Sequence, residues 1–280
     1  MSETVFLNGN WVPYEQAVVP VEDRGYLFSD AIYEVIRCYG GRPFRFDEHI
    51  RRLFNSAGAL NIPVPYTLEE WRRIGADLLA RNNLADATLY FQVSRGAAPR
   101  NHLPAEGMTP NVVGIARPVS GPARELVEQG VACMTVPDNR WGLCQIKTTG
   151  LLPNVLARQE AQSYGFYDAI FVRDGLVTEA TSSNVFAVMD GTVYTHPLAN
   201  ILPGVTRDVV IELVREMGLT LREEAVSLSR LRRADEIWLT STVIEVLPVT
   251  SLDGRPVGDG RPGPVYRRVW EAFQAVTKGG

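Results

Sequence analysis

The stretch Cys144-Gln145-Ile146-Lys147-Thr148-Thr149-Gly150 carries the one lysine in the interior of a chain that otherwise relies on arginine. The chain has 28 basic residues in 280, and all except Lys147 and Lys278 are arginines. Arginine replaces lysine in most solvent-exposed roles, but only lysine offers an amine that can lose its proton and attack a carbonyl group. Lys278 lies near the C-terminus, where we expect the chain to fray. Lys147 is therefore a candidate reactive amine, and a bias toward arginine that left one exposed loop lysine by chance is the alternative.

The composition is that of a globular protein. Apolar residues make up 45% and charged residues 21% of the chain, and the formal net charge is -4. A weakly acidic chain lacks the basic surface that sequence-independent nucleic-acid binding requires. No apolar run approaches the roughly 18 residues of a membrane-spanning helix. We therefore expect neither nucleic acid nor a membrane as a partner.

The three cysteines, Cys38, Cys133 and Cys144, are odd in number and show no C-x-x-C spacing. Such a set is typical of reduced thiols and argues against a thiolate metal site. The first ten residues contain no basic patch followed by a long apolar run, so no secretory signal is expected. Together these features predict a cytoplasmic protein without a metal.

Turn signals divide the chain into short strands and amphipathic helices. Asn8-Gly9, Gly40-Gly41, Asp174-Gly175 and Asp190-Gly191 each separate two apolar runs and predict hairpins. Strands are expected within 5–12 as a hairpin and at 33–39, 43–46, 88–94, 112–116, 131–136, 168–172, 176–178, 185–188, 192–194 and 236–240. Helices are expected at 47–60 with Asp47 as N-cap, 67–82 with a capping box at Thr67, 124–129, 155–164, 206–217, 227–233 and 263–277.

Mixed strands and helices with many hairpins predict an α+β architecture. The segment 117–122 is rich in residues that break regular structure and marks the expected domain boundary. We expect an N-terminal domain of residues 1–118, a linker of residues 119–123 and a C-terminal domain of residues 124–280.

Two segments contain side chains that could bind a carboxylate or another anion. Arg100 and His102 follow a strand, and in an extended segment both would point to one side and could grip a carboxylate. A solvated surface loop is the alternative. Residues 178–184, Thr-Glu-Ala-Thr-Ser-Ser-Asn, could form a turn whose backbone N–H groups cradle an anion, or a plain polar connection between strands.

Two further segments could hold a phosphate. Gly204-Val205-Thr206 begins a predicted helix, and a helix N-terminus attracts phosphate through its free N–H groups and its dipole. Ordinary N-capping by Thr206 is the alternative. Thr240-Ser241-Thr242 ends a predicted strand and could add hydroxyl or N–H donors.

Taken in order, these segments resemble one known family over nearly the whole chain. The chain is similar to the class IV (fold-type IV) pyridoxal-phosphate-dependent aminotransferases, and within them to the bacterial D-amino-acid branch. The residues that carry the resemblance are Glu22-Asp23-Arg24-Gly25-Tyr26, Phe28-Ser29-Asp30-Ala31-Ile32-Tyr33-Glu34-Val35, Glu48-His49-Ile50-Arg51-Arg52-Leu53, Tyr90-Phe91-Gln92-Val93-Ser94-Arg95-Gly96, Ile146-Lys147, Leu156-Ala157-Arg158-Gln159-Glu160-Ala161, Thr178-Glu179, Ser182-Ser183-Asn184-Val185-Phe186, Gly204-Val205-Thr206-Arg207-Asp208-Val209-Val210 and Thr240-Ser241-Thr242. Two positions depart from the pattern: an asparagine is typical near Gly150, and a serine is typical at Thr181. Both departures loosen the substrate assignment and leave the fold assignment intact.

The resemblance implies a smaller N-terminal α/β sandwich domain and a larger C-terminal pseudo-barrel α/β domain. It implies that Lys147 forms a Schiff base with pyridoxal 5'-phosphate and moves a proton between the substrate Cα and the cofactor C4′. The other positions at which it implies contact with the cofactor are Arg52, Glu179 at the pyridine nitrogen, Ser182, Ser183, Leu202, Val205, Thr206, Ser241 and Thr242. Tyr33, Arg100 and His102 would form the substrate carboxylate trap, which the family builds across a homodimer interface. Whether Glu34 touches the substrate is left open.

The activity implied is ping-pong transamination between a D-amino acid, of the D-alanine, D-glutamate and D-aspartate class, and a 2-oxo acid such as pyruvate or 2-oxoglutarate. The Arg100-x-His102 pair favours this branch over the branched-chain L-amino-acid aminotransferases. That activity and the elimination catalysed by aminodeoxychorismate lyase are the alternatives on the same scaffold. A catalytically silent binding or assembly protein is the alternative from another class.

Overall fold

The polypeptide divides into two units, and the computed structural model describes the backbone of residues 3–279 and the side chains of residues 3–277. Unit 1 comprises the chain up to Ser120 together with Ile146–Gly150, and unit 2 comprises Gly121–Gln145 and the residues from Leu151 onward. The expected linker at 119–123 spans the first junction between the units. One segment differs from the sequence-based division: Ile146–Gly150, which contains Lys147, belongs to unit 1 and not to the C-terminal domain.

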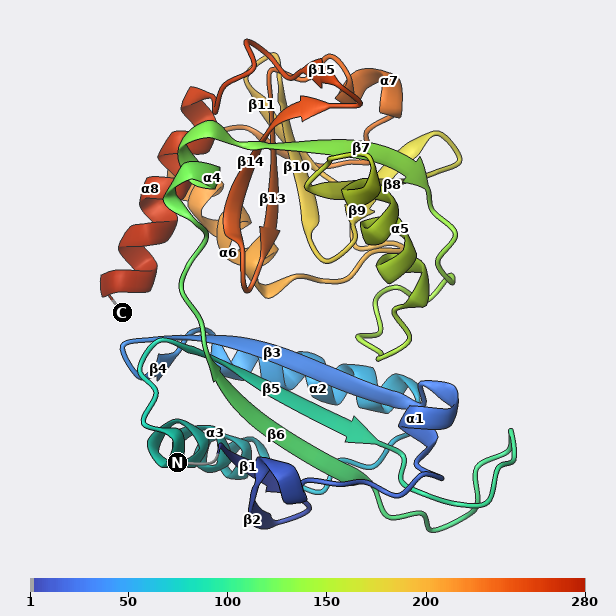
Figure 1. Ribbon diagram of the computed structural model, residues 1–280. Coiled ribbons are helices and arrows are strands. Elements are labelled where there is room, and N and C mark those ends of the chain that lie inside the picture. The colour runs from blue at the N-terminus through green and yellow to red at the C-terminus, as the bar shows by residue number, and fades with distance from the viewer. Residues whose placement is uncertain (1–2, 280) are drawn as a thin grey trace. The chain divides into compact units, whose positions relative to one another are not determined.

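Unit 1 is an antiparallel sheet with helices packed on one of its faces (Figure 1). Across the sheet, in the order β2-β1-β6-β5-β3-β4, lie β1 (Thr4–Leu7), β2 (Asn10–Pro13), β3 (Ala31–Tyr39), β4 (Arg42–Pro43), β5 (Ala87–Ser94) and β6 (Asn111–Pro118). The helical elements are the 3₁₀ turn η1 (Tyr14–Gln16), α1 (Arg24–Phe28), α2 (Phe46–Ala59) and α3 (Leu68–Asn82). The β1–β2 hairpin turns at Asn8 and Gly9, whose φ angles of 49° and 88° are those of the predicted two-residue turn.

The alternation of side chains along β3 decides which of them face the core of unit 1. Ile32 and Ile36 are fully buried with apolar side chains of α2 and α3, among them Leu53 and Trp71. Each such side chain contributes roughly 1.5–3 kcal/mol on burial. Because successive strand residues point to opposite faces, this packing fixes the register of β3 and turns Tyr33 to the face without helices.

The two main helices of unit 1 begin in different ways. The capping box at Thr67 is present, with the Glu70 amide donating to Thr67 Oγ1 and the Thr67 amide donating to Glu70 Oε2. The predicted cap at Asp47 is wrong, because α2 begins at Phe46 after Arg45 and has no side-chain cap. Asp47 instead accepts hydrogen bonds from Arg72 of α3, at 3.1 and 2.6 Å, and so ties the two helices together.

Unit 2 is built on a closed ring of strands. The ring runs β10-β13-β14-β7-β8-β9, and Asn184 of β10 pairs with Glu179 of β9 to close it. The strands of the unit are β7 (Val131–Pro137), β8 (Asp168–Arg173), β9 (Leu176–Ala180), β10 (Asn184–Met189), β11 (Thr192–Thr195), β12 (Leu221–Glu223), β13 (Glu236–Ser241), β14 (Glu245–Leu252) and β15 (Arg255–Pro256). Its helices are α4 (Arg124–Gln129), α5 (Leu152–Ser163), α6 (Val205–Glu216), α7 (Leu228–Leu231) and α8 (Pro264–Gly279). The pairs β14–β7 and β7–β8 are parallel, and the other pairs in the ring are antiparallel.

One strand of this ring, β14, is not predicted from the sequence. Pro248 lies in the middle of it, paired with Trp238, and a proline inside an apolar run argues against a central strand. The start of α5 is also earlier than expected, at Leu152, because Pro153 fits the first turn of a helix. α8 continues to Gly279, and the side chain of Lys278 lies outside the described residues. Between residues 3 and 279, no helix is both long enough and apolar enough to cross a membrane.

Candidate active site

Lys147 lies in a short segment whose backbone is bound to the edge of β3. Its amide donates to Ser56 Oγ of α2 at 3.1 Å, and its carbonyl accepts from the Tyr33 amide at 3.0 Å. Thr149 donates to the Ala31 carbonyl, and Ile146 is buried in the unit 1 core. The segment is therefore not a freely exposed loop, and the half-buried side chain of Lys147 extends from a fixed backbone.

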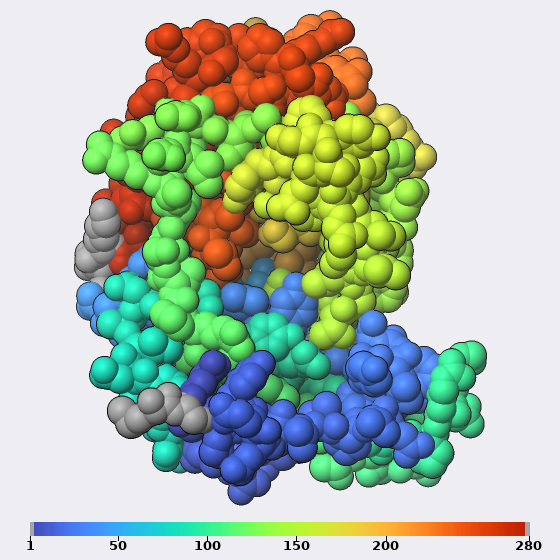
Figure 2. Space-filling view, viewed as in Figure 1, coloured from blue at the N-terminus to red at the C-terminus, as the bar shows by residue number. Residues whose placement is uncertain are grey.

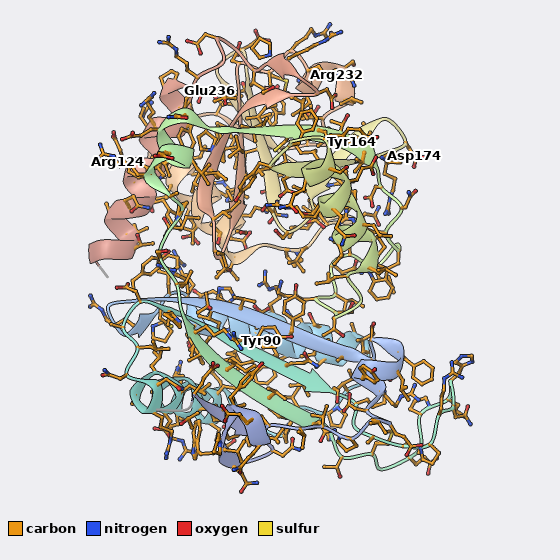
Figure 3. The ribbon with its side chains drawn as sticks, viewed as in Figure 1. Tyr90, Arg124, Tyr164, Asp174, Arg232 and Glu236 are labelled. Atoms are coloured by element: carbon orange, nitrogen blue, oxygen red, sulfur yellow. The ribbon has the colours of Figure 1, made fainter. Side chains whose placement is uncertain are left out.

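The amine of Lys147 lies over an aromatic wall. Its Nζ is 4.3 Å from the centre of the Tyr33 ring. Tyr33 stacks on Tyr90, labelled in Figure 3, with ring centres 5.7 Å apart. Burial and the neighbouring Tyr33 raise the pKa of Tyr90 to about 12, and its hydroxyl donates to Gln92 at 2.6 Å. The Tyr90 hydroxyl is thus protonated and hydrogen-bonded to Gln92. The aromatic ring that contacts the amine of Lys147 is that of Tyr33.

Behind this wall, Glu34, His49 and Arg52 form a buried charged cluster. Glu34 is fully buried, and its two oxygens accept from Arg52 Nε at 2.7 Å and Nη2 at 2.8 Å. Burial alone would raise the pKa of Glu34, but the charge and hydrogen bonds of Arg52 outweigh it and lower that pKa to about 2. Glu34 therefore orients the guanidinium of Arg52.

The proton of His49 can be assigned from this geometry. Nδ1 lies 2.8 Å from Glu34 Oε2, and an ionised carboxylate only accepts, so Nδ1 carries the proton. Arg52 Nη2 lies 3.4 Å from Nδ1, but both nitrogens then carry hydrogens, so this contact is not a hydrogen bond. Burial lowers the pKa of His49 against the pull of Glu34, so the ring is neutral.

Replacing Glu34 with glutamine is expected to lower the free energy of unfolding at pH 7 by about 3–5 kcal/mol, because Arg52 would be left without its buried counter-charge. Because the pKa of Glu34 is lowered, its ionised carboxylate adds to the free energy of unfolding by an amount on the order of 3 kcal/mol. This stabilisation is present above about pH 4.5 and is lost as the pH falls toward 2. Urea unfolding of the cofactor-free protein at pH 7 and pH 3.5 should show the difference shrinking at the lower pH. Glu69→Gln, on the exposed side of α3, should leave the free energy of unfolding nearly unchanged at both pH values. A loss for Glu34→Gln that is equal at pH 7 and pH 3.5 would contradict the assigned ion pair.

Arg100 and His102 lie in the loop that joins β5 to β6, which projects past the ends of these strands (Figure 1) and stands out from the rest of unit 1 as the green segment at the right of Figure 2. Both side chains are exposed and both contact Phe28: the Arg100 guanidinium lies 5.1 Å from the ring centre, and the His102 ring lies 5.6 Å away, edge-on. Arg24 holds the loop by donating to the carbonyls of Asn101 and His102, at 2.5 and 3.0 Å. Both members of the predicted pair thus share one aromatic neighbour, Phe28.

In unit 2, Glu179 is a buried carboxylate near the end of β9. Its Oε1 accepts from Arg140 Nη1, and its Oε2 accepts from Asn184 Nδ2 and the Leu202 amide, each at 3.1 Å. Burial raises the pKa of Glu179 to about 7, and the adjacent Arg140 opposes the rise. The side chain is therefore held rigidly by three donors and titrates near neutrality.

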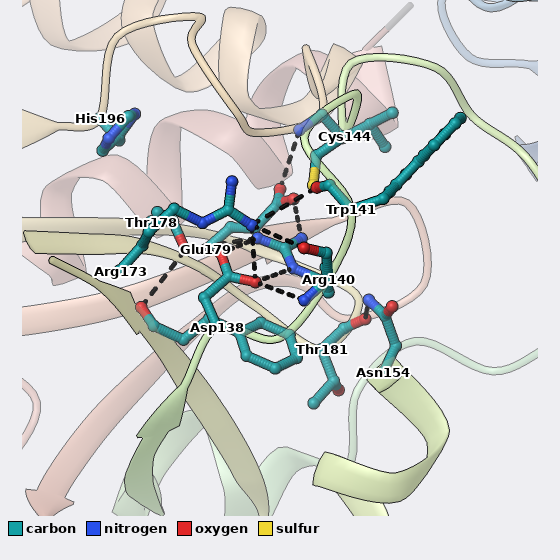
Figure 4. Close-up of polar contacts among 12 residues, drawn as sticks. Asp138, Arg140, Trp141, Cys144, Asn154, Arg173, Thr178, Glu179, Thr181 and His196 are labelled. Atoms are coloured by element: carbon teal, nitrogen blue, oxygen red, sulfur yellow. Dashed lines mark hydrogen bonds and ion pairs between the residues drawn. The ribbon is translucent and has the colours of Figure 1, made fainter. Parts of the chain in front are cut away.

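Arg140 belongs to a buried charge network (Figure 4). Its side chain is 5% exposed and that of Asp138 is 0% exposed. Arg140 donates to Asp138 through Nε and Nη2, both at 2.9 Å, and lies 4.5 Å over the Phe171 ring. Arg173 also reaches Asp138, at 3.2 Å. The guanidinium that contacts Glu179 is thus fixed from two other sides.

Asn184 joins Glu179 to the start of α6. Its Nδ2 donates to both Glu179 and the Leu202 carbonyl. A Cβ on Gly204 would lie 2.0 Å from Asn184 Oδ1, so only glycine fits there. Gly204 is the N-cap of α6 and provides no side-chain cap, and Thr206 lies inside the helix, so N-capping by Thr206 is wrong. The N-terminal N–H groups of α6, including those of Val205 and Thr206, are available to an anion.

Hydroxyl groups gather at the same edge of the ring. Asn184, the first residue of β10, pairs with Thr240 near the end of β13. The hydroxyls of Ser183 and Thr240 are buried and have no hydrogen-bond partner among the described residues. Ser182 is exposed, and Ser241 and Thr242 are half-buried at the end of β13. A buried hydroxyl without a partner costs about 1–3 kcal/mol. Two of them beside a carboxylate and an uncapped helix fit a ligand with a ring nitrogen and a phosphate, as pyridoxal 5'-phosphate has.

The structure explains one of the two departures from the family pattern, Thr181. Thr181 keeps the hydroxyl that a serine would supply, and it donates to the buried Asp168 at 2.6 Å. At Gly150 the amide donates to Thr148 Oγ1 at 3.2 Å, and a Cβ would lie 3.4 Å from that of Ser29. Asn154 lies four residues further on and donates to the Thr181 carbonyl at 2.8 Å.

Three residues of this arrangement were not identified from the sequence as site residues. Asn184 and Thr240 lie inside the quoted motifs, and a polar side chain at a strand end is the signal that could have found them. Arg140 carries no local signal, because its partner Glu179 lies 39 residues further along the chain.

Comparisons with known proteins give one consistent result. The family described as amino-transferase class IV matches residues 31–252. A D-alanine aminotransferase of Bacillus licheniformis is 44% identical over 271 residues, which cover 96% of this chain and 95% of that protein. A branched-chain amino acid aminotransferase of Escherichia coli is 32% identical with a TM-score of 0.93 and covers 100% of this chain and 96% of its own. The corresponding enzyme of the organism abbreviated T.th., solved with pyridoxamine 5'-phosphate, is 28% identical with a TM-score of 0.93, over 100% of this chain and 95% of its own.

Proposed function

Because the chain belongs to the class IV aminotransferase family, we propose that it transfers an amino group between a D-amino acid and a 2-oxo acid, with pyridoxal 5'-phosphate as cofactor. The observation that carries the proposal is Lys147, the single internal lysine, held by its backbone on β3 with its amine over Tyr33. The near-full-length likeness to D-alanine aminotransferases supports the D configuration.

The chain's residues would divide the work as follows. When bound, the cofactor supplies an aldehyde that takes up the amino group and a ring that accepts electrons from the substrate Cα. Lys147 Nζ would be the point of covalent attachment, where the amino group of the substrate would replace it. The freed amine would then carry the proton from the substrate Cα to the cofactor C4′. Glu179 holds the proton of the ring nitrogen.

We propose that the phosphate is held by one guanidinium and by several uncharged donors. Arg52 supplies a guanidinium that Glu34 fixes through two hydrogen bonds. The N-terminus of α6 at Val205 and Thr206, with the hydroxyl of Thr242, supplies uncharged donors. A fixed cation and a helix N-terminus together favour a dianion.

Arg52→Ala is expected to weaken cofactor binding by about 10- to 100-fold, the usual effect of losing a charge-assisted hydrogen bond. Cofactor content after dialysis, read from absorbance, checks this. Arg52→Lys keeps the positive charge but lacks the planar guanidinium, so its affinity for the cofactor should lie between those of the parent protein and Arg52→Ala. Unchanged cofactor content in a folded Arg52→Ala protein would remove Arg52 from the phosphate site.

We propose that the active form is a homodimer in which Arg100 and His102 reach the active site of the other copy and, with its Tyr33, bind the substrate carboxylate. Support comes from their exposed, projecting position and from apolar side chains left exposed on one face of α5. Leu152 is 68% and Leu156 is 56% exposed there. Light scattering on the purified protein measures the mass directly, and a monomer that retains full activity would contradict this arrangement.

The substrate panel that tests the function compares D-alanine, D-glutamate and D-aspartate with L-valine and L-leucine, using pyruvate or 2-oxoglutarate as acceptor. We expect turnover of the D-amino acids, because fixing the carboxylate decides which face of Cα meets Lys147. Turnover of only L-valine or L-leucine would favour the branched-chain activity, which the structural neighbours make the second candidate. Pyruvate release from aminodeoxychorismate without a 2-oxo acid would identify the lyase.

A cytoplasmic location stays a prediction, supported by the three cysteines, which are buried and unpaired.

A further inference from the structure

The hydrogen bonds of Glu179 leave little room for a further partner. A carboxylate has about four acceptor positions, two on each oxygen. Both positions of Oε2 are used, by Asn184 Nδ2 and the Leu202 amide. On Oε1 only Arg140 Nη1 is bound among the described residues. A ring nitrogen that binds Glu179 therefore has one acceptor position, on the oxygen that Arg140 already contacts.

The contacts of Arg140 fix its guanidinium in this position. Asp138 binds its Nε and Nη2 in a two-pronged pair, which leaves Nη1 for Glu179. Phe171 covers its plane, and Thr178 Oγ1 lies 3.3 Å from Nη2. An arginine held in this way loses no further freedom when it binds Glu179, and its charge is permanent at any physiological pH.

We propose that Arg140, anchored by Asp138, is a positioning residue that favours the ionised form of Glu179 and aligns Oε1 for the ring nitrogen of the cofactor. This inference rests on the proposed cofactor chemistry, and it adds a residue that acts on the ring only through Glu179.

The charges around Glu179 give the sign of the effect. Arg140 faces it directly, Asp138 and Arg173 lie behind Arg140, and the Cys144 thiol lies close enough to be influenced by it. Burial raises the pKa of Glu179, and Arg140 is the main opposing charge. Removing Arg140 would leave the effect of burial less opposed, so Glu179 would take up a proton at a still higher pH. A neutral Glu179 no longer favours a protonated ring nitrogen.

The test is a pH profile of the holoenzyme and three variants. Arg140→Met removes the charge, Arg140→Lys keeps it, and Arg173→Met removes a guanidinium that binds Asp138 without contacting Glu179. For Arg140→Met we expect the acid limb of kcat with D-alanine to move up by about one to two pH units, the equivalent of one lost hydrogen bond to a charged group. Arg140→Lys should recover at least half of that shift, and Arg173→Met should match the parent.

A second readout does not depend on turnover. Titration of the cofactor-free protein with pyridoxal 5'-phosphate between pH 5 and pH 9, followed by absorbance, gives the affinity at each pH. For Arg140→Met the loss of affinity toward low pH should begin one to two units higher than in the parent. If Arg140→Met fails to fold, the pair Asp138→Asn with Arg140→Met removes both charges and should show a smaller displacement in the same direction, because Asp138 raises the pKa of Glu179.

The outcomes separate the inference from the proposed function. Profiles of folded Arg140→Met that superimpose on the parent in both readouts would overturn the role of Arg140, and so would an equal shift in Arg173→Met. A parent that binds the cofactor with the expected pH dependence but does not turn over D-amino acids would contradict the proposed substrate and leave the role of Arg140 supported.

Discussion

Lys147→Ala is expected to abolish transamination, with a loss on the order of 10⁴-fold or more, because no other group can both attach the cofactor and move the proton at the substrate Cα. Lys147→Arg should be equally inactive, since it restores a positive charge over the Tyr33 ring but not an amine that loses its proton. Initial rates with D-alanine and pyruvate measure the loss. The fold should survive, because the contacts that hold this segment come from its backbone and from Ile146.

The composition of the chain makes the matching control simple. Lys278 is the only other lysine, and Lys278→Ala should leave activity unchanged. Borohydride reduction followed by trypsin should give one modified peptide of residues 141–158, uncut at Lys147. The same modification on another residue, or on none, would contradict the assignment of Lys147.

Glu179→Gln is expected to keep most of the cofactor and to lose turnover by about 10²- to 10³-fold, the usual effect of removing one preorganised charged group. The amide is close in shape to the carboxylate, so contacts around Asn184 and Leu202 largely persist, but it cannot stabilise a protonated ring nitrogen. Cofactor absorbance and the kcat with D-alanine separate the two effects.

The matched control is Glu160→Gln on the exposed face of α5, which should behave like the parent. Full activity in Glu179→Gln would show that Glu179 does not act on the ring. Loss of the cofactor together with activity would instead assign it a binding role alone.

The sequence predicts local features of this fold well where a short-range interaction fixes them. The turn at Asn8-Gly9 and the capping box at Thr67 each depend on neighbouring residues only, and both are present. Asp47 shows the limit of such patterns, since a distant Arg72 binds the carboxylate that was expected to cap α2. Pro248 shows it as well, because pairing with Trp238 in the ring outweighs what its type suggests.

The same distinction holds for the site. Lys147 stands out by chemistry alone, because its residue type is so rare in this chain. The contact of Glu34 with Arg52 depends on packing of β3 against α2, and that of Arg140 with Glu179 depends on the pairing of β7 and β9 with β8 between them. Neither contact follows from spacing along the chain.

The return of Ile146–Gly150 to β3 has a consequence for how such proteins can be recombined. The chain crosses between its two units at Ser120, after Gln145 and after Gly150, so neither unit is a continuous module. A chimera of two relatives joined only after Ser120 would seat one parent's pentapeptide on the other parent's strand. A chimera that keeps unit 1 intact has to take residues 146–150 from the same parent as the N-terminal portion. A single crossover between two such genes cannot do this if it falls between the codons for residues 120 and 146.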